Sequence, residues 1–137
     1  MNPFAAHQIQ LGIETLSLRC ERIASNALQI AQFLSDHPLV SWVSYPGLSG
    51  DKYHVRAMKY LRRGFGGVLA FGVKGGNVGS CAFVDPLKLV SYMTKYDLIR
   101  LSVGAEDIED IIDDLSGAFN AIPPDTLSTI DMGQSMV

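Results

Sequence analysis

The eight residues from Asp97 to Gly104 constrain the fold of this 137-residue chain more than any other segment. Successive side chains of a β-strand point to opposite faces of its sheet. On one face this segment places three aliphatic side chains that suit packing beneath helices: Ile99, Leu101 and Val103. On the other face it places Leu98, Arg100 and Ser102. The sequence therefore predicts a strand that holds a guanidinium at its centre, opposite the face that packs on helices.

Two interpretations of Arg100 are open on this pattern. The direction of an arginine side chain on a strand is preorganised by the backbone, so its guanidinium can bind a carboxylate through two parallel hydrogen bonds. Charged side chains are also usually exposed, so the same pattern fits a solvent-facing arginine without a ligand. Arg100 is the one candidate binding residue that the spacing identifies.

Composition limits the class of protein. The length fits a single domain with its own core. The net charge is −3 and Lys and Arg are spread along the chain, so we expect no nucleic-acid partner and no membrane partner. Cys20 and Cys81 are far apart without a CxxC spacing, which indicates no metal site and a reducing, cytoplasmic setting. The first residues resemble neither a signal peptide nor a membrane span.

Helical patterns dominate both ends of the chain. Asn2 before Pro3 predicts a capped helix start, and helical periodicity continues to His37-Pro38. Gly12 is a weak point, so we expect either two consecutive helices or one long helix bent near residues 12–15. Near the other end, acidic residues crowd the first turn of an amphipathic helix over residues 106–119.

Strands and shorter helices fill the middle. Residues 39–45, 66–73 and 97–104 predict strands, a short helix is expected around 54–61, and Asp85-Pro86 predicts the start of a helix reaching Met93. These elements predict an α+β or α/β domain over residues 1–122, with a small sheet of about three strands covered by helices on one face. The α+β class is the one that the family resemblance given below implies. The strand directions are left open. Residues 123–137 are expected to form a disordered tail.

No motif supplies a catalytic group. Gly64–Gly67 precedes a strand, so it indicates a close-packed bend and not a phosphate loop, and Gly75-Gly76-Asn77 indicates a turn. Lys95 lies in a sequence context like that of Schiff-base lysines, but no phosphate site is nearby and a solvated lysine is favoured. The three histidines lie too far apart along the chain to suggest a metal site.

Four ordered blocks resemble a known family: residues 12–19, 40–48, 59–61 with 64–69, and 97–104 with the acidic helix that follows. Together they are similar to the C-terminal domain of the fold-type I pyridoxal-phosphate (PLP) enzymes of cysteine and methionine metabolism. The O-acetylhomoserine sulfhydrylase branch is the most similar. The resemblance implies transsulfuration chemistry in methionine biosynthesis, in which sulfide replaces the acetoxy group of O-acetylhomoserine to give homocysteine. It also implies a PLP cofactor, an oligomer, and an arginine at the position of Arg100 that binds the α-carboxylate of the amino-acid substrate.

The chain also departs from the family pattern. The family's Schiff-base lysine, phosphate-binding residues and ring-stacking aromatic match no residue here, so we expect no covalent PLP and no catalysis by this chain alone. The family has a further strand and a loop before the arginine strand, and their loss should leave an unpaired, aggregation-prone sheet edge. Two alternatives are a non-catalytic module docking on a full-length paralogue through Leu11–Leu18, and a truncated gene-model product.

Overall fold

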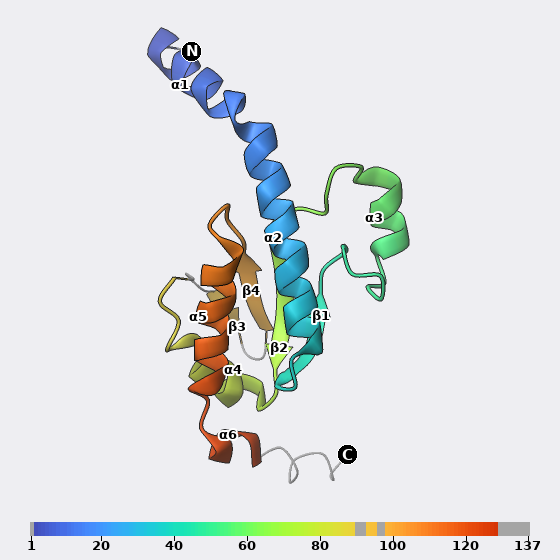
Figure 1. Cartoon of the computed structure of the whole chain (residues 1–137), viewed down its shortest axis with the longest axis vertical. Coiled ribbons are helices and arrows are strands. Elements are labelled where there is room, and N and C mark those ends of the chain that lie inside the picture. The colour runs from blue at the N-terminus through green and yellow to red at the C-terminus, as the bar shows by residue number, and fades with distance from the viewer. Residues whose placement is uncertain (1, 90–92, 96–97, 129–137) are drawn as a thin grey trace.

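The computed structural model describes residues 2–89, 93–95 and 98–128, which form one sheet with helices around it (Figure 1). The helices are α1 (Pro3–Glu14), α2 (Leu16–Asp36), α3 (His54–Tyr60), α4 (Gly76–Val84), α5 (Ile108–Asn120) and α6 (Pro124–Ser128). The strands are β1 (Val40–Ser44), β2 (Val68–Val73), β3 (Met93–Lys95) and β4 (Leu98–Ser102). The sheet order is β1-β2-β4-β3, and every neighbouring pair is antiparallel, which settles the strand directions.

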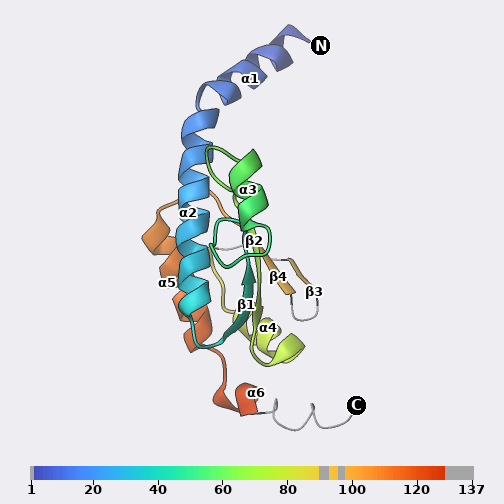
Figure 2. The same ribbon diagram turned by 90° about the vertical axis from the view of Figure 1, so that its right-hand side faces the viewer.

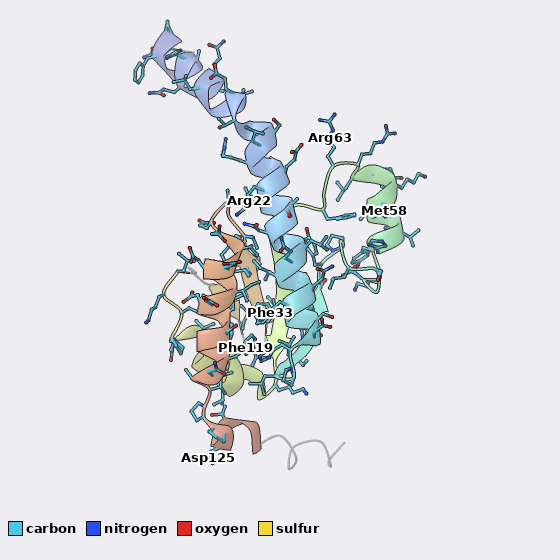
Figure 3. The ribbon with its side chains drawn as sticks, viewed as in Figure 1. Arg22, Phe33, Met58, Arg63, Phe119 and Asp125 are labelled. Carbon is cyan, nitrogen blue, oxygen red and sulfur yellow. The ribbon has the colours of Figure 1, made fainter. Side chains whose placement is uncertain are left out.

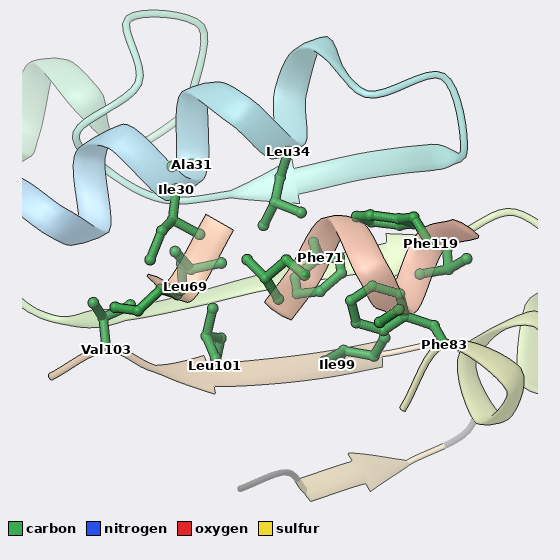
Figure 4. Close-up of a cluster of buried hydrophobic side chains, with 14 of the residues drawn as sticks. Ile30, Ala31, Leu34, Leu69, Phe71, Phe83, Ile99, Leu101, Val103 and Phe119 are labelled. Atoms are coloured by element: carbon green, nitrogen blue, oxygen red, sulfur yellow. The ribbon is translucent and has the colours of Figure 1, made fainter. Parts of the chain in front are cut away.

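The core lies between one face of the sheet and the helices, as predicted for an α+β domain. Figure 2 shows α2 and α5 side by side on this face. Phe71 of β2 is fully buried, and its ring meets that of Phe83 of α4 edge-on at 5.7 Å. Phe83 in turn contacts Phe119 of α5 at 4.4 Å between ring centroids (Figure 4). Three elements distant in sequence are therefore joined by one aromatic cluster, with Ile30 and Leu34 of α2 completing the layer.

The predicted break in the N-terminal helix is confirmed. Asn2 Oδ1 accepts a hydrogen bond from Phe4 N at 2.9 Å, and α1 then runs to Glu14, with Thr15 between it and α2. Arg19 holds the junction, because its Nη2 donates to Gly12 O at 2.8 Å. Helix α1 has no buried residue and extends away from the body of the domain (Figure 1). No helix in the described ranges is both long and apolar enough to cross a membrane.

The prediction that a helix starts at Asp85-Pro86 is wrong. The helix of this region, α4, ends there instead, and Asp85 caps its C-terminus. Gly75, predicted to lie in a turn, adopts φ +99° at the N-cap, and the helix begins at the next residue. The backbone N–H groups of Lys88 and Leu89 donate to the Asp114 carboxylate of α5, so a distant side chain takes the place of a helical first turn.

The sheet has one strand more than the predicted three. Met93–Lys95 pairs with β4 as the edge strand β3, in a segment predicted to be a helix end and a junction. The opposite edge, β1, has an irregular register between Val40 and Trp42, and there Ser41 Oγ donates to Gly72 O at 3.0 Å. The segment predicted to be a disordered tail begins with α6, and residues 129–137 lie outside the described ranges.

Asp107 is the N-cap of α5, and we expect Asp107→Ala to lower the free energy of unfolding by about 1 kcal/mol. Its carboxylate accepts a hydrogen bond from Glu109 N at 3.1 Å, which satisfies one of the unpaired N–H groups of the first turn. Urea denaturation measures the change. Glu21→Ala removes an exposed carboxylate from α2 and serves as the control. Equal losses for the two variants would show that the cap has no role of its own.

His37 makes stability depend on pH. Its ring stacks on Phe119 at 3.8 Å, and its Nδ1 accepts a hydrogen bond from Leu39 N at 3.2 Å. Burial lowers the pKa of His37 below its ordinary value of 6.5. The unfolded chain therefore takes up this proton more readily than the folded chain. The stabilising contribution is complete above the unfolded pKa and is lost as the pH falls through the folded one.

We accordingly expect the free energy of unfolding to fall between about pH 7.5 and about pH 5.5, with His37→Gln showing a smaller decline. Urea titrations at several pH values measure it. His7→Gln alters an exposed histidine of α1 and should decline as the unmodified chain does. The same slope in the His37 variant and in the unmodified chain would rule out His37 as the cause.

Candidate functional site

Arg100 lies on the face of the sheet that α2 and α5 leave uncovered. The other face of β4 carries Ile99, Leu101 and Val103, which are 2, 3 and 8% exposed. Leu98, Arg100 and Ser102 are all exposed. The predicted division of this strand into a packing face and an outward face is confirmed. Whether Arg100 binds a carboxylate stays a prediction.

Arg100 lies beside a small residue on the neighbouring strand β2. Its Cα partner on β2 is Ala70, which pairs in turn with Ser44 on β1. On the same face of β2, Gly72 lies beneath the indole of Trp42, because a Cβ at Gly72 would come 2.3 Å from Trp42 Nε1. The outward face therefore has a low floor of small side chains, bordered by an aromatic ring on one side and a guanidinium on the other.

A hollow of about 460 Å³ opens over this floor. Its lining includes Trp42, Ser44, Asp51, Lys52, Ala70 and Leu98. Asp51 is fixed in place, since its Oδ1 accepts from Tyr53 N at 2.8 Å and its Oδ2 accepts from Ser44 Oγ at 3.4 Å. A carboxylate thus lies at the β1 side of the hollow, and the strand of Arg100 lies across Ala70 from it. Arg100 itself does not line the hollow, but its backbone pairs with that of Ala70, which does.

Sequence patterns identify neither Trp42 nor Asp51 as a site residue. Alternation along β1 places Trp42 and Ser44 on one face, but the pattern does not say that this face also carries Arg100. Asp51 comes from the loop after β1, where no periodic signal exists. Only the pairing of β1 with β2 brings these residues to the strand of Arg100.

The remaining candidate motifs do not converge on this site. Gly64–Gly67 forms a close-packed bend, as predicted: a Cβ at Gly67 would lie 2.2 Å from Ile23 Cγ2 of α2. Lys95 lies on β3, but its side chain falls outside the described part. Within the described residues, no group of three or more histidine, cysteine or acidic side chains could hold a metal ion.

The described residues do not fit PLP. A Schiff-base lysine is activated by burial or by a neighbouring cation, and the described lysines, Lys52, Lys59, Lys74 and Lys88, are all exposed. The glycine bend that could have cradled a phosphate is filled by contacts with α2. The charged residues that line the hollow are Asp51 and Lys52.

Comparisons with known proteins agree with the fold. Residues 1–96 match the family model described as Cys/Met metabolism PLP-dependent enzyme. A homocysteine/cysteine synthase of Saccharomyces cerevisiae is 41% identical over 89% of this chain and 36% of its own length. An O-acetyl-L-homoserine sulfhydrylase of Leptospira meyeri is 39% identical over 89% of this chain and 35% of its own length.

A solved structure gives the same result. The O-acetylhomoserine sulfhydrylase of Wolinella succinogenes superposes with a TM-score of 0.79 at 32% identity, covering 86% of this chain and 38% of that one. The chain thus spans about a third of the length of the curated relatives it matches. The alignment with the yeast relative runs over 163 residues, which exceeds the 137 residues present here, so that relative carries internal residues that this chain lacks.

Proposed function

Because this chain belongs to the Cys/Met metabolism PLP-dependent enzyme family, we propose that it is the substrate-carboxylate-binding part of an O-acetylhomoserine sulfhydrylase-type enzyme. The observation that carries the proposal is the position of Arg100, which lies on the uncovered face of β4 beside the small residue Ala70. A planar guanidinium on a strand meets a carboxylate with two aligned donors. The relatives named homocysteine synthase and sulfhydrylase suggest which amino acid it binds.

Each side chain of the site has a role in this proposal. Arg100 binds the α-carboxylate of O-acetylhomoserine, and Asp51 faces its ammonium group. Trp42 and Leu98 border the apolar part of the ligand with their exposed surfaces, which are 38 and 41% of each residue. In family members PLP supplies the carbanion chemistry. This chain contributes binding and orientation, and by itself it converts no substrate. A cytoplasmic setting suits this role in amino-acid metabolism.

Titration of the isotope-labelled chain with O-acetyl-L-homoserine tests the proposal by NMR. We expect a dissociation constant on the order of 1 mM, as for a small ligand held by one charged pair and a few contacts. The shifted amide signals should come from β1, β2 and β4 around Ser44, Ala70 and Arg100. Shifts confined to α5, or none at saturating ligand, would contradict it.

Borohydride trapping tests the claim that this chain does not hold the cofactor covalently. We expect PLP followed by borohydride to label the exposed lysines in low and scattered yield, because none of those described is activated by burial. Mass spectrometry of peptides locates the label. Stoichiometric labelling of one lysine would contradict the proposal.

Docking on a full-length relative is a second candidate function. It is favoured by α1, which has no buried residue, and by the apolar side chains along α1 and the start of α2. Among them, Leu18 is 67% exposed and Leu11 is 46% exposed. Co-expression with a full-length sulfhydrylase and affinity purification of this chain tests it. Copurification that is lost in Leu11→Glu/Leu18→Glu supports docking, and a solitary chain contradicts it.

A further inference from the structure

The segment of residues 52–63, here called the basic arm, concentrates positive charge in an acidic chain. The protein has 11 Lys and Arg residues and a net charge of −3. Five of the 11 belong to the arm, and all five are exposed: Lys52, Arg56, Lys59, Arg62 and Arg63. The prediction that Lys and Arg are spread along the chain is therefore wrong for this segment. Figure 3 shows Met58 and Arg63 projecting away from the body of the domain.

The basic arm also exposes large apolar side chains. Val55, Met58 and Tyr60 are 84, 58 and 68% exposed, and Ala57 is the one buried residue of α3. Lys52 and Lys59 each place their ammonium group near the ring of the following tyrosine, at 4.9 and 5.4 Å from the centroid. In the described part of the chain, no ion pair joins the arm to a carboxylate. Exposed apolar and cationic groups together indicate a surface for a partner of opposite charge.

The opposite charge is gathered on α5 and the loop before it. Four exposed carboxylates form what we call the acidic face: Glu106, Glu109, Asp110 and Asp113. The neighbouring Asp107 and Asp114 are already engaged, with Arg22 and with backbone N–H groups respectively. Beside the acidic face lies a hollow of about 540 Å³. It is lined by both charged and apolar groups: Pro86, Lys88, Leu89, Asp110, Asp113, Asp114, Gly117 and Ala118.

The basic arm and the acidic face cannot meet within one copy. Helix α2 and the sheet lie between them, and both views show α3 and α5 on opposite sides of α2 (Figures 1 and 2). We propose that the basic arm of one copy docks on the acidic face of a second copy of this chain. Lys59 and Arg56 then face Asp110 and Asp113, and an apolar side chain of α3 enters the hollow between them. The contact is head-to-tail, so repetition gives rings or chains.

Sedimentation velocity of the full chain at two salt concentrations tests this proposal. The Debye length shrinks from about 30 Å at 0.01 M salt to about 3 Å at 1 M, so the contact is strong at low salt and weak at high salt. We expect an apparent mass that rises with protein concentration in about 10 mM NaCl. In about 1 M NaCl it should return to the 14.9 kDa of one chain.

Charge reversal identifies the two surfaces. Arg56→Glu/Lys59→Glu makes both surfaces acidic, and Asp110→Lys/Asp113→Lys makes both basic. Each variant alone should lose about tenfold or more in association constant, because like charges then face each other. An equimolar mixture of the two should associate again, since each arm meets an opposite face. The single variant Lys59→Glu is also compared with Lys74→Glu, a control that reverses one exposed charge outside the arm.

Several results would overturn the proposal. A chain that stays monomeric at low salt has no such contact, and association that persists at high salt is driven by apolar surfaces such as α1. Equal losses in Lys74→Glu and Lys59→Glu would show a dependence on net charge and not on the arm. A monomer whose basic arm binds vesicles containing phosphatidylserine would assign the arm to an anionic membrane surface instead.

Discussion

Replacing Phe71 by alanine is expected to lower the free energy of unfolding by about 3–5 kcal/mol. The side chain is fully buried at the centre of β2, between α2 and the ring of Phe83. Removing it takes away its burial free energy and leaves a cavity that rigid neighbours cannot fill. Because domains of this kind are stable by about 5–15 kcal/mol, the variant would lose a large share of its stability.

Urea denaturation followed by circular dichroism measures the loss. Phe4→Ala deletes the same atoms from α1, where the ring is 68% exposed, and should change stability by less than about 0.5 kcal/mol. A loss below about 1 kcal/mol for Phe71→Ala would mean that the aromatic cluster does not hold β2, α4 and α5 together.

The second large effect concerns ligand binding. Arg100→Gln should weaken O-acetyl-L-homoserine binding by about 10- to 100-fold, since hydrogen bonds to a charged group contribute about 1.5–3 kcal/mol. Arg100→Lys keeps the charge but cannot present two parallel donors. Its affinity for the ligand should therefore lie between those of the unmodified chain and of Arg100→Gln. The NMR titration described above measures the change. Lys74→Gln removes a cation elsewhere on the surface and should bind as the unmodified chain does.

A ligand analogue without the carboxylate tests whether Arg100 contacts that group. 3-Aminopropyl acetate is O-acetylhomoserine without its carboxylate, and the unmodified chain should bind it as weakly as Arg100→Gln binds the amino acid. With this ligand, Arg100→Gln should cause no further loss. If the arginine variant weakened both ligands equally, Arg100 would act on the shape of the site and not on the carboxylate.

The sequence predicts those elements whose pattern is local and strong. The alternation along β4 placed Arg100 opposite three buried aliphatic residues, and the acidic first turn marked α5. Asn2-Pro3 and the break near Thr15 followed from capping chemistry and from the cost of Gly12 in a helix. In each case the residues that decide the structure lie within a few positions of one another.

Prediction failed where a distant contact overrides the local signal. Helix α4 is poor in helix-forming residues, yet it forms because Gly79 packs against the Lys74 carbonyl, where a Cβ would come within 2.2 Å, and because Phe83 is buried. Asp85-Pro86 carries the pattern of a helix start, but Asp114 satisfies the N–H groups that follow it. Likewise, the hollow beside Arg100 depends on strand order, which no local pattern specifies.

The two outer strands of the sheet have a consequence for how copies of the chain can associate. Growth of a sheet from one molecule to the next requires a long outer strand whose unpaired backbone N–H and C=O groups are regularly spaced. Here β3 is only three residues long, and the hydrogen-bond register of β1 is interrupted by an irregularity at Ser41. Cross-molecule strand pairing, the route to amyloid-like fibrils, is therefore disfavoured at both borders, in contrast to the aggregation-prone edge expected from the sequence. Oligomers of this protein should keep their far-ultraviolet spectrum unchanged and fail to bind thioflavin T.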